Sequence, residues 1–190
     1  MRKMKKALII FGSPHQNGST SRVLNFLKEK IKSEFDFYTI NAYERNPKPC
    51  IDCGRCKEAG ECVFYDLEDL DYYLSVCNLV IFAFPVYNHS LPSPLKAIID
   101  RMQRYYNLKK CTGSSPFEKN SKKGIVLLTM GSCDFEKSVI SAQIEPTARL
   151  LNIIDINYII LNNTDDKKLN IDKFLLKSEN SIKGIISNLN

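Results

Sequence analysis

Short apolar runs alternate with stretches of helical period along this sequence. The runs at 7–11 and 79–84 contain no polar residue and stop at Gly12 and Pro85. Uninterrupted runs of this length are typical of strands that are buried on both faces of a parallel sheet. Further strands are predicted at 35–40, 124–130 and within 153–161.

Between these runs, apolar residues recur near the 3.6-residue period of a helix. After the first run, Ser19 or Thr20 is placed to cap a helix whose apolar face includes Val23, Leu27 and Ile31. Other helices are predicted near 67–75, from 94 to about 105, from about 137 to 151 and after 171, with a long loop at 107–121. The repeated alternation of strand and helix predicts a doubly wound α/β fold, a parallel sheet with helices on both faces.

The length of 190 residues suits one domain, 1–190, with a cysteine-rich excursion at 46–65. No apolar run reaches 18 residues, and the basic start at 1–6 leads into too short an apolar run for a signal peptide, so we expect a cytoplasmic protein without a membrane span. The net charge of +6 comes from scattered lysines. Without a basic stripe interleaved with aromatics, nucleic acid is not an expected partner.

Polar residues crowd the loop between the first strand and the first helix. A helix N-terminus offers N–H groups and a partial positive charge, and added hydroxyls favour a phosphate. The loop has neither the G-x-G-x-x-G pattern of dinucleotide folds nor the G-K-[ST] of a P-loop, so a terminal monophosphate fits better. The alternative is a polar turn in which Ser19 only caps the helix.

The motif of this loop resembles that of a known protein family. Gly12-Ser13-Pro14 followed by Asn17-Gly18-Ser19-Thr20 is similar to the FMN phosphate loop of the NAD(P)H-dependent FMN reductase and quinone reductase branch of flavodoxin-like proteins. The resemblance implies a flavodoxin-like five-stranded parallel sheet in the order 2-1-3-4-5. It also implies an FMN phosphate held by Ser13, Asn17, Gly18, Ser19 and Thr20.

Two further loops resemble the parts of that family that hold the flavin ring. Pro85, Val86, Tyr87 and Asn88 follow the third strand, and the helix after them ends in the pair Asp100-Arg101. These residues can supply an apolar shelf and backbone donors for the ring, although Tyr87 could instead only cover the core. Gly131, after the fourth strand, would let the backbone approach the flavin.

Four cysteines crowd into thirteen positions of the excursion: Cys50, Cys53, Cys56 and Cys62. Such soft ligands suit zinc or an iron–sulfur cluster. The spacing resembles the compact motif of iron–sulfur flavoproteins, which implies a [4Fe-4S] cluster. Zinc and a loop of metal-free thiols remain alternatives. Cys77, Cys111 and Cys133 stand apart and are interpreted as isolated thiols.

These features are consistent with three functions. The first is an FMN-dependent oxidoreductase that moves hydride or electrons from NAD(P)H to a quinone, flavin or other small acceptor, with no protein acid or base required. The second is an iron–sulfur flavoprotein that relays single electrons between ferredoxin and FMN. The third is a phosphate-binding or partner-binding module without catalysis. The resemblance also implies a homodimer or homotetramer.

Overall fold

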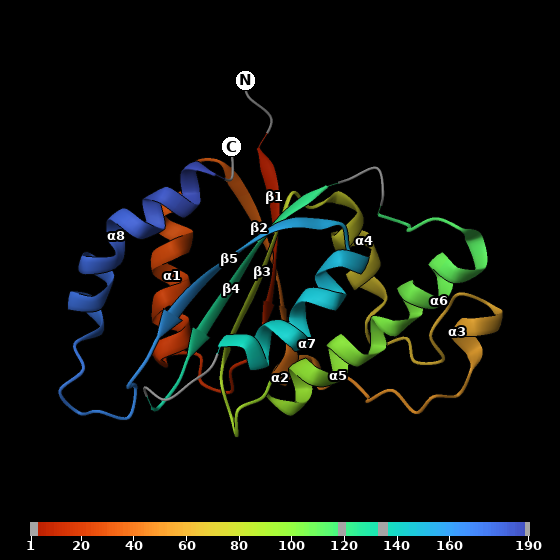
Figure 1. Ribbon diagram of the computed structural model, residues 1–190, viewed down its shortest axis with the longest axis horizontal. Coiled ribbons are helices and arrows are strands. Elements are labelled where there is room, and N and C mark those ends of the chain that lie inside the picture. Colours follow the sequence, from red (N-terminus) through yellow and green to blue (C-terminus); the bar gives the residue numbers. More distant parts are fainter. Residues whose placement is uncertain (1–3, 118–120, 133–136, 189–190) are drawn as a thin grey trace.

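Five parallel strands form one sheet in the order β2-β1-β3-β4-β5 (Figure 1). The computed structural model describes residues 4–117, 121–132 and 137–188. The strands are β1 (Lys5–Phe11), β2 (Phe35–Asn41), β3 (Leu79–Pro85), β4 (Lys122–Thr129) and β5 (Ile153–Leu161). The flavodoxin-like fold and its strand order are thereby confirmed.

The two longest apolar runs of the sequence occupy the middle of the sheet. In β1, Leu8 and Ile10 face one side while Ala7 and Ile9 face the other, and all four are fully buried. Because both faces of this strand are covered, neither needs a polar residue. The edge strand β2 has exposed positions among its buried ones, as a strand covered less completely requires.

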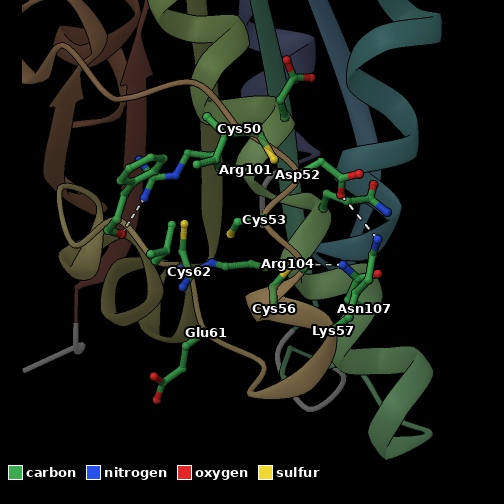
Figure 2. A pocket seen from close by; sticks show the side chains of 16 residues that line it. Cys50, Asp52, Cys53, Cys56, Lys57, Glu61, Cys62, Arg101, Arg104 and Asn107 are labelled. Carbon is green, nitrogen blue, oxygen red and sulfur yellow. Dashed lines mark hydrogen bonds and ion pairs between the residues drawn. The ribbon is translucent and has the colours of Figure 1, made fainter.

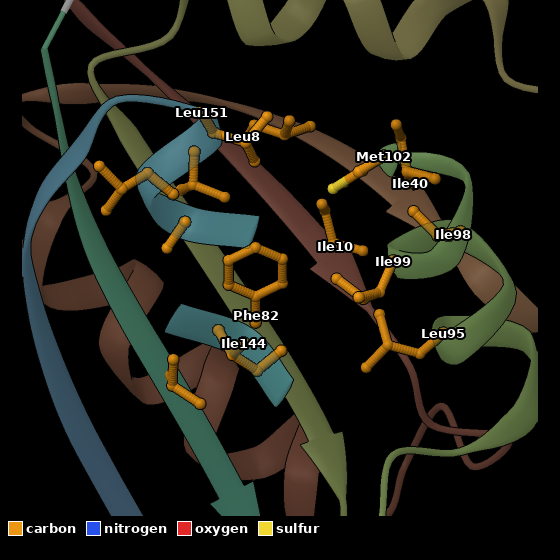
Figure 3. Packing of buried hydrophobic residues seen from close by; sticks show 14 of the residues in the cluster. Leu8, Ile10, Ile40, Phe82, Leu95, Ile98, Ile99, Met102, Ile144 and Leu151 are labelled. Atoms are coloured by element: carbon orange, nitrogen blue, oxygen red, sulfur yellow. The ribbon is translucent and has the colours of Figure 1, made fainter. Parts of the chain in front are cut away.

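Helices cover both faces of the sheet, as Figure 1 shows. One face packs against α1 (Ser19–Ile31) and α8 (Ile171–Ser187). The other packs against α4 (Glu68–Val76), α5 (Ser93–Arg101) and α7 (Lys137–Leu150). In that second core, Phe82 of β3 lies among Ile10, Ile99 of α5 and Ile144 of α7 (Figure 3).

The region after α5 differs from the sequence prediction. The helix expected from 94 to 105 is two helices, since α5 ends at Arg101 and α6 (Gln103–Thr112) follows. The first part of the predicted loop at 107–121 is therefore wrong. The polar sequence of α6 conceals a helix that buries Tyr105 and Asn107 and ends at Gly113, whose φ of +80° suits a glycine C-cap.

Two smaller differences concern helix starts and the excursion. Gly18, rather than Ser19 or Thr20, is the N-cap of α1, and its carbonyl oxygen accepts a hydrogen bond from the N–H of Arg22 at 3.0 Å. The excursion is flanked by the one-turn helix α2 (Ala42–Arg45) and contains another, α3 (Arg55–Glu58), which packs against α6. In Figure 1 the segment leaves the sheet edge at α2 and reaches α6 well outside the sheet.

Candidate functional site

The loops that follow β1, β3 and β4 are joined into one edge of the sheet. The N–H of Gly12 donates to the carbonyl oxygen of Ala83 at 2.8 Å, and the N–H of Val86 donates to that of Thr129 at 2.8 Å. Gly12 also leaves no room for a side chain, because a Cβ there would lie 2.9 Å from Cδ2 of Leu95 in α5. This edge is where open α/β sheets bind ligands.

The loop after β1 brings polar groups to the start of α1. Ser13 is buried, and its Oγ accepts a hydrogen bond from the N–H of His15 at 3.2 Å. Asn17 is exposed in the loop, and Gly18 and Ser19 are half-buried beside it. Within the described part of the chain no side chain caps α1. Its first turn therefore presents N–H groups beside hydroxyls, an arrangement suited to a phosphate.

Thr20 makes a contact that the sequence does not reveal. It is buried, and its Oγ1 lies 2.6 Å from Oγ1 of Thr129, the last residue of β4, which is also buried. This hydrogen bond fastens the start of α1 to the end of β4 beneath the loop. The hydroxyl of Thr20 thus has a partner in the protein. The group that Thr20 offers to a ligand at the helix end is its backbone N–H. Thr129 starts the loop that resembles the one beside the flavin ring, but nothing in the sequence singles out its hydroxyl as the partner of Thr20.

The loop after β3 is a tight turn that exposes an aromatic ring. Tyr87 and Ser90 exchange two backbone hydrogen bonds of 3.1 and 2.9 Å, and Asn88 and His89 between them have φ of 49° and 56°. Positive φ at both central residues is the signature of a type I′ turn. Tyr87 is 43% exposed, which argues against the alternative that it only covers the core.

Around this turn, Pro85 and Val86 are half-buried and Asn88 is exposed. Tyr43 of α2 belongs to the same neighbourhood. Its pKa is raised, first by burial and then by the electrostatic effect of Tyr87. No sequence signal marks Tyr43, because the four-residue helix that carries it is too short to give a periodic pattern.

Gly131, after β4, lies against the loop that follows β5. A Cβ at this position would come within 2.2 Å of Oδ2 of Asp165, and the N–H of Thr164 donates to the carbonyl oxygen of Met130 at 2.9 Å. Only a residue without a side chain leaves room for the carboxylate of Asp165 at this position. Cys133, in the same loop, lies outside the described residues.

The four clustered cysteines share one cavity on the outer side of α5 and α6 (Figure 2). The cavity has a volume of about 280 Å³. Its lining includes Cys50, Cys53, Cys56 and Cys62 from the excursion and Arg101, Arg104 and Asn107 from α5 and α6. Cys50 and Cys53 are exposed, whereas Cys56 and Cys62 are half-buried.

Sharing a cavity does not yet make these thiols a metal centre. In residues 4–117, 121–132 and 137–188, no three His, Cys, Asp or Glu side chains are grouped so that they could hold a metal ion. The donor chemistry suits a soft metal, while the side chains as they stand do not converge on it. The remaining described cysteines are separate, with Cys77 buried in the core and Cys111 exposed. No helix of the described chain is long and apolar enough to cross a membrane.

Comparisons with known proteins identify a family and a fold. Residues 5–164 match the sequence profile of the family described as NADPH-dependent FMN reductase. An iron–sulfur flavoprotein of Clostridioides difficile (strain 630) is 31% identical over 119 residues, which are 58% of this chain and 53% of that protein. The chain spans about half the length of the curated relatives it matches.

Solved structures share the fold at low sequence identity. An NAD(P)H:quinone oxidoreductase from Methanothermobacter marburgensis has a TM-score of 0.75 at 16% identity, covering 96% of each chain. An FMN-dependent NADH-azoreductase from Bacillus anthracis, solved in complex with FMN, has a TM-score of 0.63 at 16% identity, covering 97% of this chain and 99% of that one.

Proposed function

Since this chain belongs to the NADPH-dependent FMN reductase family, we propose that it is an FMN-dependent oxidoreductase that carries electrons from NAD(P)H to a small acceptor such as a quinone or a free flavin. The observation that carries the proposal is the N-terminus of α1, which no described side chain caps, with Ser13 and Ser19 beside it at the edge where three loops join. FMN, when bound, supplies the hydride and electron chemistry.

The residues of this edge fit the two ends of FMN. The first turn of α1 offers backbone N–H groups and a partial positive charge for the phosphate, with Ser13, Asn17, Gly18 and Ser19 around it. The turn after β3 offers the half-buried Pro85 and Val86 together with the exposed Tyr87 and Asn88 for the ring. Gly131, whose Cα faces the carboxylate of Asp165, lies in the third loop of this edge.

The proposal is tested by comparing FMN with riboflavin, which lacks the phosphate. Fluorescence titration of the flavin-free protein should give an FMN affinity at least a hundredfold higher than that for riboflavin, because charge-assisted hydrogen bonds hold the phosphate. In the variant Ser19→Asp, a carboxylate stands in the first turn, where it favours the helix dipole but repels a phosphate. We expect this variant to lose FMN affinity while riboflavin binding stays the same.

Anaerobic bleaching of the bound flavin by NADH or NADPH then tests the redox reaction and identifies the donor. Equal affinity for FMN and riboflavin in the native protein, or FMN affinity unchanged by Ser19→Asp, would contradict the phosphate site.

A second function is favoured by the shared cavity of the four cysteines. We propose that Cys50, Cys53, Cys56 and Cys62 bind a [4Fe-4S] cluster, so that the protein relays single electrons between ferredoxin and FMN. The name of the Clostridioides difficile relative, an iron–sulfur flavoprotein, supports this. Iron and acid-labile sulfide, measured per chain after anaerobic purification, test it; about four of each per chain is expected, and zinc or no metal would contradict it.

The assembly is a third element of the proposal. The exposed Tyr87 leaves the ring side of the edge open, and a homodimer or homotetramer would cover it. Light scattering coupled to size-exclusion chromatography, with and without FMN, measures the mass; a monomer under both conditions would contradict this element.

A further inference from the structure

We propose that Arg101 positions the four-cysteine site by clamping together the two ends of the segment that carries it, and that Asn107 orients Cys56 within that site. Neither residue touches the edge where FMN is proposed to bind. The inference depends on the second function above, the metal site of the excursion.

Arg101 contacts both ends of the excursion at once. It is the last residue of α5 and is only 6% exposed. Its Nη2 donates to the carbonyl oxygen of Phe64 at 2.8 Å, and its Nη1 donates to the carbonyl oxygen of Lys48 at 3.4 Å and to the carboxylate of Asp66. A single buried guanidinium therefore holds the chain where it enters and where it leaves the excursion.

Asp66 completes the clamp from the other side. Its Oδ2 accepts the N–H of Lys48 at 2.8 Å, while its other oxygen accepts from Arg101. Burial alone would raise the pKa of Asp66, but the N–H of Lys48 and the guanidinium of Arg101 hold that pKa below its ordinary value. The carboxylate thus stays charged and keeps the two ends joined.

The clamp lies next to the first and the last cysteine of the cluster. Cys50 follows Lys48 by two residues, and Cys62 precedes Phe64 by two. Two residues of extended chain reach at most about 7 Å. Fixing the two carbonyl groups on one guanidinium therefore limits how far Cys50 and Cys62 can move from the clamp, and both line the cavity although eleven residues separate them in the sequence.

Asn107 acts on the middle of the cluster. This buried residue of α6 donates from Nδ2 to the Sγ of Cys56 at 3.1 Å. Cys56 lies in α3, which packs against α6. Hydrogen bonds of this kind orient a ligand sulfur, and loss of such an outer-shell partner weakens metal binding about 10- to 100-fold. Arg101 and Asn107 therefore order the excursion before any metal arrives, which lowers the entropy lost when the thiols close on it.

Arg104 provides a matched comparison. It lines the same cavity and carries the same charge, but it pairs with Asp71 of α4 and with the hydroxyl of Tyr105 at 3.0 Å. Neither partner belongs to the excursion. Removing Arg104 changes the charge of the cavity without releasing the clamp, whereas removing Arg101 does both.

The experiment is an anaerobic Cd²⁺ titration of the reduced, metal-free, full-length protein. The ultraviolet thiolate-to-cadmium absorption reports how many thiolates bind each ion. We expect four in the native protein and in Arg104→Met, at similar affinity. We expect fewer than four in Arg101→Met, with an affinity about 10- to 100-fold lower, and four with about tenfold weaker binding in Asn107→Leu.

Thermal unfolding and FMN binding show in each sample whether the sheet has folded. Should Arg101→Met fail to fold, Asp66→Asn replaces it, because that variant weakens the clamp and keeps the buried guanidinium. Full four-thiolate binding in every variant that loosens the clamp, or an equal loss in Arg104→Met, overturns the inference and leaves the metal site standing. A native protein without a four-thiolate cadmium site overturns both.

Discussion

The edge of the sheet and the cysteine excursion are held in place by different interactions. At the edge, backbone hydrogen bonds such as that from Gly12 to Ala83 continue the pattern of the sheet, and the buried pair Thr20 and Thr129 locks the loops together. In the excursion most residues are exposed or half-buried, and Arg101 joins its ends. The edge site follows from the fold, whereas the excursion depends on a few side chains.

The largest effect is expected from replacing Cys50, Cys53, Cys56 and Cys62 by serine together. Metal binding should be lost completely, because hydroxyls do not replace soft thiolates, while FMN affinity stays within about twofold of the native value since none of these four cysteines lies in the loops of the edge. Metal content and FMN titration measure the two outcomes, with Cys111→Ser as the control. Loss of FMN binding as well would break the distinction between the two regions.

A loss of thiol reactivity of about a hundredfold is expected for Cys77, which is buried in the core outside both regions. Burial raises the pKa of Cys77 to about 11 from 9.0, which lowers its thiolate fraction about a hundredfold at neutral pH. Cys53 is exposed and should react freely with iodoacetamide in the native, metal-free protein, whereas Cys77 should react only after unfolding. Mass spectrometry of labelled peptides checks this; equal rates would contradict the burial of Cys77.

The same shift gives a pH dependence. The pKa of Cys77 is higher in the folded protein than in the unfolded chain. The neutral thiol therefore contributes fully to the stability of the fold below about pH 9, and this contribution is lost as the pH rises through about 11. Urea unfolding from pH 8 to 11 should therefore show a steeper loss of stability in the native protein than in Cys77→Ala. Parallel curves for the two proteins would argue against this assignment.

A moderate effect is expected at the edge from Thr129→Val. It leaves the buried hydroxyl of Thr20 without its partner, which should lower the free energy of unfolding by about 1–3 kcal/mol and reduce FMN affinity, with no effect on cadmium binding. The double variant Thr20→Val/Thr129→Val should recover much of the stability, because both polar groups are then gone. Denaturant titrations of the three proteins check this; additive losses would show that the two hydroxyls do not interact.

The smallest effect is expected from low pH on the stability of the excursion. The pKa of Asp66 is lower in the folded protein than its ordinary value of 3.8. The ionised carboxylate therefore contributes fully to the stability of the excursion above pH 3.8, and this contribution is lost as the pH falls through the folded pKa. Acid-stable proteases should cut within residues 48–66 faster below about pH 4 than above it. Asp66→Asn should remove most of this pH dependence, and a persistent one would show that another group controls the segment.

Much of the fold could be read from the sequence because its strongest signals are local. The apolar runs that became β1 and β3 have no alternative to burial on both faces, and Gly12 and Pro85 mark where they end. Gly18 and Ser19 were placed near the ligand edge by their position after the first strand. In contrast, the part of α6 beyond about residue 105 was missed because its polar sequence has weak periodicity, and α6 packs against α3 and buries Tyr105.

The sequence by itself determined the alternation of the five strands with the main helices along the chain, the polar loop at the start of α1 and the four closely spaced cysteines, since each depends on neighbouring residues. Only the tertiary structure decided that Thr129 would meet Thr20 and that Arg101 would hold Lys48 and Phe64. Those contacts join residues from 37 to 109 positions apart. They arise when the chain folds back on itself, and no local pattern of residues encodes them.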